Sequence, residues 1–167
     1  MKTVKKVLVA LAFSDYAKGT FNFAAQFAQC SDAELIVASV INSRDVGSVE
    51  TISAMGYEVN GSNYIQSIKD ERRRILDGLV SDGGYSLEKV RCLFLVGNPI
   101  EELLKTILEE EIDVVVMGPK GRTDLEYILV GSVAEKIFRR SPATVISYRE
   151  EKVADQLRRR IQRRLKG

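Results

Sequence analysis

Short, almost uninterrupted apolar runs recur along the chain and alternate with amphipathic stretches. The runs cover residues 7–12, 35–41, 90–96, 113–118 and 143–148. Runs of this length that are apolar on both faces are typical of central strands in a parallel sheet, because helices cover both sides of such a sheet. The pattern therefore predicts five parallel strands.

Helical spacing of apolar residues fills most of the intervals between these runs. The predicted helices run from Ala17 to about Cys30, from Ser62 to Leu79, from Ile100 to Leu108 and from Ser132 to Arg140. Ser14 and Asp15 are candidate N-caps for the first helix, and Asn98 with Pro99 for the third. Residues 42–60 show no sustained period, so we expect a long loop there, or a loop with one helical turn.

Strands that alternate with helices favour an α/β fold built on an open, doubly wound parallel sheet, since such crossovers are right-handed and need helices on both faces. We expect the strand order 3-2-1-4-5 with about four helices and a helical extension at the C-terminus. Ligands bind such sheets beyond the carboxyl ends of the strands, where the strand order reverses. The candidate site therefore lies beyond the first and fourth strands.

A glycine-containing segment follows the fourth run. Residues 117–123, Met-Gly-Pro-Lys-Gly-Arg-Thr, leave the strand, and Gly131-Ser132 starts the next helix. Glycines permit positive φ and close approach of the backbone, and the N–H groups at Ser132 lie at the positive end of the helix dipole. Such a loop can hold a phosphate group, and Lys120 and Arg122 add positive charge. The alternative is a loop that uses glycine only to turn the chain.

The spacing G-x2-G-x9-G-S of this segment resembles the nucleotide-binding signature of the universal stress protein family, and weaker similarities extend the resemblance over residues 4–148. Neither a Walker loop nor a dinucleotide fingerprint is present. The resemblance implies that the chain binds ATP or AMP, with Mg²⁺ as a possible companion of the phosphates. It implies a site made of Ala12, Phe13, Ser14, Val40, Met117, Gly118, Lys120, Gly121, Arg122, Gly131, Ser132 and Val133.

One residue departs from the family pattern. Members that bind ATP usually carry an aspartate at the end of the first strand, where it contacts the ribose or adenine, whereas this chain has Ala12. One lost hydrogen bond costs on the order of 1–3 kcal/mol, or roughly ten- to hundredfold in affinity. We therefore expect binding to be weakened rather than abolished. Val40 matches the position whose backbone meets adenine in the family.

The chain contains no histidine, which removes the commonest general base and the usual partner of a nucleophilic serine or cysteine. We therefore expect a stress-response or regulatory module that uses its nucleotide as a conformational signal and is not an enzyme. One alternative is an interaction module with an empty site, which Ala12 favours. Another is an ATP-using enzyme of related architecture, although the loop at residues 12–15 lacks the glycines that such enzymes carry there.

Composition indicates one soluble domain of 167 residues. No apolar run approaches the ~20 residues that span a bilayer, and no signal peptide is evident, so we expect a cytoplasmic protein. Cys30 and Cys92 lie beside apolar residues and are predicted to be buried free thiols. The arginines at 72–74 are predicted to form a solvated helix face rather than a nucleic-acid patch.

The predicted domain covers residues 1–149, and residues 150–167 form a basic extension. The extension holds seven Lys or Arg and three Asp or Glu, so its charge is 7 − 3 = +4 and the remainder of the chain carries 2 − 4 = −2. Val153, Leu157, Ile161 and Leu165 form an apolar stripe at helical spacing. The helix could dock on the domain or a partner subunit, bind an anionic partner such as RNA or lipid, or be disordered.

The fifth strand is expected to end the sheet. Its run at 143–148 is apolar, and an unpaired edge of this kind favours association with another strand. We therefore predict a homodimer joined through residues 143–148, as in many members of the family that the glycine signature resembles.

Overall fold

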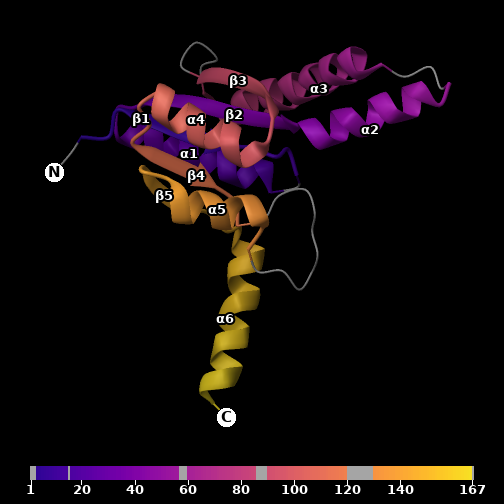
Figure 1. The fold of residues 1–167 in the computed structure, drawn as a ribbon. Helices are drawn as coiled ribbons and strands as arrows, with labels where there is room; N and C mark the ends of the chain where they lie inside the picture. The colour runs from indigo at the N-terminus through magenta and orange to yellow at the C-terminus, as the bar shows by residue number, and fades with distance from the viewer. Residues whose placement is uncertain (1–2, 15, 57–59, 86–89, 120–129, 167) are drawn as a thin grey trace.

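The computed structural model describes residues 3–14, 16–56, 60–85, 90–119 and 130–166 (Figure 1). The strands are β1 (Lys6–Ala10), β2 (Glu34–Asn42), β3 (Val90–Gly97), β4 (Val114–Met117) and β5 (Thr144–Ser147). The helices are α1 (Ala17–Cys30), α2 (Ser43–Ala54), α3 (Gly61–Asp82), α4 (Pro99–Glu109), α5 (Ser132–Arg140) and α6 (Glu151–Leu165).

The strands form one sheet in the order β3-β2-β1-β4-β5, and every neighbouring pair is parallel. This confirms the predicted class and strand order. In β1, Val7, Leu8 and Val9 are all fully buried, as expected of a strand covered on both faces. Because side chains alternate along a strand, Val7 and Val9 belong to one core cluster and Leu8 to the other.

Each face of the sheet has its own pair of helices. Phe21 of α1 and Leu76 of α3 pack with Val7 and Val9. On the opposite face, Ile107 of α4 and Ile137 of α5 pack around Leu8, Ile36 and Val115. The helix predicted at residues 100–108, α4, begins as expected, since the Asn98 side chain accepts from Ile100 N at 3.0 Å and Pro99 takes the first helical position.

The prediction of a loop at residues 42–60 was wrong over most of that segment, because α2 occupies Ser43–Ala54. The helix starts where the Asn42 side chain accepts a hydrogen bond from Arg44 N at 3.1 Å, and Asp45 in the first turn suits the helix dipole. Among the residues of α2 none is buried. Its partly covered face holds Val46, Val49 and Ser53, and two valines are too short an apolar stripe for hydrophobic periodicity to reveal the helix.

Three smaller expectations were also wrong. Arg72 is 5% exposed, because successive helical residues turn by about 100° and one of three arginines faces the sheet. Cys30 is exposed, since it is the last residue of α1. Cys92 is only partly buried, and this burial raises the pKa of its thiol. The N-cap of α1 is Tyr16, with no side-chain cap bond, whereas Ser14 contributes its backbone carbonyl to Ala17 N at 2.8 Å.

α6 follows β5 and projects away from the sheet (Figure 1). Its base lies against α1: a Cβ atom added to Gly19 would meet the Glu150 carboxylate at 2.8 Å and the Tyr148 ring at 3.0 Å. No residue of α6 is buried, and Ile161 and Leu165 are 56% and 81% exposed. The extension is therefore a helix that meets its own domain at its base, and docking on a partner subunit or binding to an anionic partner stays a prediction. No helix in the described part of the chain is long and apolar enough to cross a membrane.

Candidate functional site

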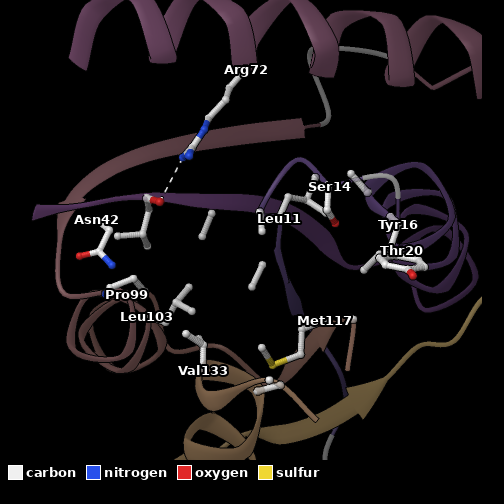
Figure 2. Close-up of a pocket in the computed structure, with 18 of the residues that line it drawn as sticks. Leu11, Ser14, Tyr16, Thr20, Asn42, Arg72, Pro99, Leu103, Met117 and Val133 are labelled. Atoms are coloured by element: carbon white, nitrogen blue, oxygen red, sulfur yellow. Dashed lines mark hydrogen bonds between the residues drawn. The ribbon is translucent and has the colours of Figure 1, made fainter. Parts of the chain in front are cut away.

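A pocket of about 740 Å³ opens at the carboxyl ends of β1 and β4, where the strand order reverses (Figure 2). This volume lies in the range of ordinary small-molecule sites. Ala10 and Leu11 end β1 on one wall, Met117 ends β4, and Leu103 of α4 and Val133 of α5 lie below. The position agrees with the rule that ligands bind such sheets at the reversal of strand order.

One wall of the pocket is the free backbone edge of β2. β1 and β2 separate where Leu11 N donates to Ala38 O at 2.9 Å, and β2 continues to Asn42. Because backbone groups alternate in direction along a strand, the N–H and C=O of Val40 point the same way as those of Ala38. They face the space beyond β1. Arg72 Nη1 already donates to the Val40 carbonyl at 3.1 Å (Figure 2).

The opposite wall includes the start of α5. Its first intrahelical bond runs from Glu135 N to Gly131 O at 3.0 Å, so the N–H groups of residues 132–134 are not used inside the helix. Gly131, Ser132, Val133 and Ala134 all line the pocket. A helix N-terminus of this kind favours an anion through its N–H groups and its dipole.

Gly131 itself behaves differently from the expectation. Its φ of −70° and ψ of 152° are extended values that any residue adopts, so positive φ is not the reason for glycine here. Its N–H donates to Pro119 O across 2.6 Å and is not a free donor. Glycine suits this position because it places no side chain beside the pocket.

Comparison with known proteins agrees with this arrangement of sheet and pocket. The model of the universal stress protein family matches residues 3–149. This chain belongs to the universal stress protein family.

Individual relatives support the same conclusion. Universal stress protein MJ0577 of Methanocaldococcus jannaschii is 28% identical in an alignment of 153 positions that covers 85% of this chain and 93% of that protein. Its solved structure covers 90% of this chain and 99% of its own, with a TM-score of 0.72. A putative universal stress protein of Staphylococcus saprophyticus is 30% identical over 93% of this chain and 89% of its own length.

A third solved structure is a universal stress protein in complex with cAMP. It is 22% identical to this chain, covers 89% of it and 98% of its own length, and has a TM-score of 0.60. At 22% identity, this similarity supports the fold alone.

The pocket of this universal stress protein brings together most of the site residues predicted from sequence. Those that line it are Ala12, Ser14, Val40, Met117, Gly118, Gly131, Ser132 and Val133. Phe13 is not among the lining residues. It has a positive φ of 51°, packs against the core, and holds its ring 5.9 Å from the guanidinium carbon of Arg72. Lys120, Gly121 and Arg122 lie outside the described residues.

Sequence reasoning missed the part of the wall that α2 and α3 supply. Asn42, Asp45 and Ser48 come from the segment that was predicted as a loop, and Tyr64 and Arg72 from the helix after it. Asp45 and Arg72 are the charged groups of the described lining. The N-cap at Asn42 was a readable signal for α2, but nothing in the sequence indicated that α2 returns to the pocket.

Proposed function

We propose that this universal stress protein binds ATP or AMP in the pocket and uses the nucleotide as a regulatory signal. One observation carries the proposal: the N-terminus of α5 and the edge of β2 that extends beyond β1 face the same pocket. The α5 terminus suits phosphates, because its first N–H groups are unused within the helix. The edge of β2 suits a base, because the Val40 N–H can donate to a purine and the Val40 carbonyl can accept a second bond beside the one from Arg72. A universal stress protein with the same fold has been solved in complex with cAMP, which is also an adenine nucleotide.

Magnesium would enter this site with the phosphates. Mg²⁺ is commonly held by one or two carboxylates together with phosphate oxygens and water. Asp45 is the carboxylate of the described lining. The described residues contain no group of three His, Cys, Asp or Glu that could hold a metal alone, so the phosphates would have to supply further oxygen ligands.

We also propose that the nucleotide is not turned over. The chain has no histidine to activate a water molecule. Asp45 is the carboxylate of the described lining, and it would be needed to hold Mg²⁺. Chromatography of ATP after incubation with the protein should recover it largely intact. Rapid appearance of ADP that scales with protein concentration would contradict the proposal.

Nucleotide binding itself is tested by thermal unfolding and calorimetry with protein purified without added nucleotide. At a concentration 100 times the Kd, a ligand should stabilise the fold by about 2.7 kcal/mol and raise Tm by several degrees. ATP, ADP and AMP are each tested with and without Mg²⁺. If none of them shifts Tm or releases heat, the proposal fails.

Gly131→Val locates the site. The extended backbone at Gly131 accepts valine, so the variant should fold, while the new side chain lies beside the pocket. We expect the nucleotide-dependent shift to disappear. Gly78→Val is the matched control, because a Cβ atom at Gly78 of α3 meets nothing within 4 Å and Gly78 is not a lining residue. An unchanged shift in Gly131→Val would place the ligand elsewhere.

A protein-interaction module with an empty site is the second candidate. Two observations favour it: Ala12 takes the place of the family aspartate, and Gly131 N–H already donates to Pro119 O. This candidate predicts no nucleotide effect at any concentration, so the same titrations distinguish the two functions.

A further inference from the structure

α6 combines an exposed apolar stripe with a strongly basic surface. Val153, Leu157, Ile161 and Leu165 are four residues apart, and each step adds about 40° beyond a full turn, so the stripe winds slowly around the helix. Val153 and Leu157 near the base are partly covered. Ile161 and Leu165 are 56% and 81% exposed, and exposed large aliphatic side chains on one helix face mark a contact surface.

The charge of α6 is concentrated on its outer half. Between Glu151 and Leu165 the helix holds six Lys or Arg and two acids, a net charge of 6 − 2 = +4. Both acids are engaged by one residue, since Arg158 Nη1 contacts Glu151 and Asp155. No acidic residue follows Asp155 in the chain. The basic residues beyond Arg158 are Arg159, Arg160, Arg163, Arg164 and Lys166.

The direction of α6 leaves this outer half accessible. The helix leaves the domain beside β5 and α5 and points away from the sheet (Figure 1). Its base is fixed where Glu150 and Tyr148 meet α1 at Gly19. A flat partner could therefore reach the stripe and the arginines together without contact between that partner and the pocket.

Three occupants are conceivable, and two fit poorly. RNA would use the arginines but would gain nothing from the exposed Ile161 and Leu165. A second copy of α6 would cover the stripe, yet it would bring two charges of +4 together. An anionic bilayer uses both features, because an amphipathic helix buries its apolar face at the headgroup boundary while its Lys and Arg meet lipid phosphates.

We propose that α6 docks this protein on anionic phospholipid membranes. Ile161 and Leu165 enter the boundary between headgroups and acyl chains, and Arg160 and Arg164, on the flank of the stripe, reach the lipid phosphates, whereas Arg159 and Arg163 lie on the opposite side of the helix. The helix lies on the surface and does not span it. This inference is independent of the proposed function, since the α6 residues do not line the pocket.

The test is flotation of the full-length protein with vesicles made of equal parts phosphatidylglycerol and phosphatidylcholine. We expect binding at low salt that falls steeply as salt is added, and no binding to vesicles of phosphatidylcholine alone. Failure of the full-length protein to float with the anionic vesicles at low salt would overturn the proposal.

Two double variants separate stripe from charge. Ile161→Gln/Leu165→Gln removes the exposed stripe and keeps the charge, and should weaken vesicle binding by about tenfold or more. Arg160→Gln/Arg164→Gln removes two charges on the flank of the stripe, and should weaken it about 25-fold, or roughly fivefold for each arginine. Glutamine is a good helix former, so circular dichroism should show that helix content is retained. Arg44→Gln/Arg74→Gln, on the exposed faces of α2 and α3, removes the same charge elsewhere and should leave binding unchanged.

The other occupants give different results. Single-stranded RNA binding that survives Ile161→Gln/Leu165→Gln, without binding to vesicles, would overturn the membrane proposal in favour of nucleic acid. A loss of sedimenting mass in the same variant, again without vesicle binding, would overturn it in favour of a second copy. Vesicle binding that needs the arginines but ignores Ile161 and Leu165 would also contradict it, because insertion requires both.

Discussion

Arg72 Nη1 donates a hydrogen bond to the Ser39 hydroxyl across 2.7 Å, and this contact joins α3 to β2 at the rim of the pocket. The same nitrogen donates to the Val40 carbonyl at 3.1 Å. Arg72 is 5% exposed and Ser39 is 1% exposed, so both groups are removed from water. Such buried, charge-assisted bonds are costly to break, because a partner left without its bond keeps its desolvation penalty.

Replacement of Arg72 by leucine should therefore destabilise the fold. We expect the free energy of unfolding to fall by about 2–3 kcal/mol, measured by urea denaturation. Arg74→Leu is the matched control, because Arg74 is an exposed member of the same arginine run and should change stability by less than about 0.5 kcal/mol. Equal effects of the two substitutions would show that the contacts of Arg72 add no stability.

Ala12→Asp should strengthen nucleotide binding. Ala12 lines the pocket and is only half-buried, so a carboxylate can be placed there with access to water. The new acceptor restores the residue that ATP-binding members usually carry, and a gain of about ten- to hundredfold in affinity is expected by calorimetry. Ala12→Asn has nearly the same shape without the charge and should gain less. Weaker binding in Ala12→Asp would exclude a ribose or adenine contact at this position.

Ser147→Pro should separate a dimer joined through β5. Thr144 N donates to Asp113 O at 3.1 Å and Tyr148 N donates to Met117 O at 3.0 Å. The backbone N–H groups of the even-numbered residues in this segment therefore point to β4. Alternation then points the N–H of Ser147 to the open edge. Proline at 147 removes a donor from that edge without loss of a bond to β4.

Sedimentation at tens of micromolar is the measurement for the dimer, with Ser147→Ala as the control that keeps the N–H group. We expect a dimer for the wild-type chain and for Ser147→Ala, and a monomer for Ser147→Pro. A wild-type monomer, or a dimer that persists in Ser147→Pro, would contradict pairing through this edge.

Glu110 is expected to contribute to the loss of stability in acid. The hydrogen bond from Arg91, whose Nη1 lies 2.9 Å from Glu110 Oε1, lowers the pKa of this carboxyl below its ordinary value of 4.5. A lowered folded-state pKa stabilises the fold above the unfolded pKa, and this stabilisation is lost as pH falls through the folded value. The pair is partly exposed, so its contribution is about 1 kcal/mol or less.

Glu110→Gln should therefore lower stability at about pH 7 and change it little at about pH 3, so that the decline of stability with acid becomes shallower. Urea unfolding at a series of pH values measures this slope. Glu109→Gln, which removes an exposed carboxylate 3.9 Å from Lys105, should leave the slope almost unchanged. A parallel decline in wild type and Glu110→Gln would exclude the Arg91 pair as a source of acid sensitivity.

Hydrophobic pattern predicted the sheet because burial forces a simple rule on each strand. Val7, Leu8 and Val9 are apolar in succession, since helices cover both faces. Right-handed crossovers limited the strand orders without selecting one, and 3-2-1-4-5 is one of the usual doubly wound orders. The start of α4 was also readable, because Asn98 and Pro99 satisfy the helix terminus by local chemistry.

The candidate site was less predictable where it depends on contacts between distant segments. The exposed helix α2 has too short an apolar stripe to be recognised, so Asp45 and Ser48 could not be placed at the pocket. The burial of Arg72 depends on which side of α3 meets β2, and Ser39 is 33 residues away in sequence. The run of three arginines at 72–74 therefore suggested a solvated helix face, although Arg72 is buried and bonds to β2.

The first turn of α1, which contains Gly19, lies between the base of α6 and the pocket. Glu150 and Tyr148 at the base of α6 lie against Gly19, while Ala17 and Thr20 of the same turn line the pocket. α6 has 15 residues and is therefore about 22 Å long, so a tilt at its base would displace its far end more than the base itself. A ligand that tilts the turn slightly would swing the far end of α6 through a larger arc, which energy transfer between dyes on α4 and at the end of α6 would report.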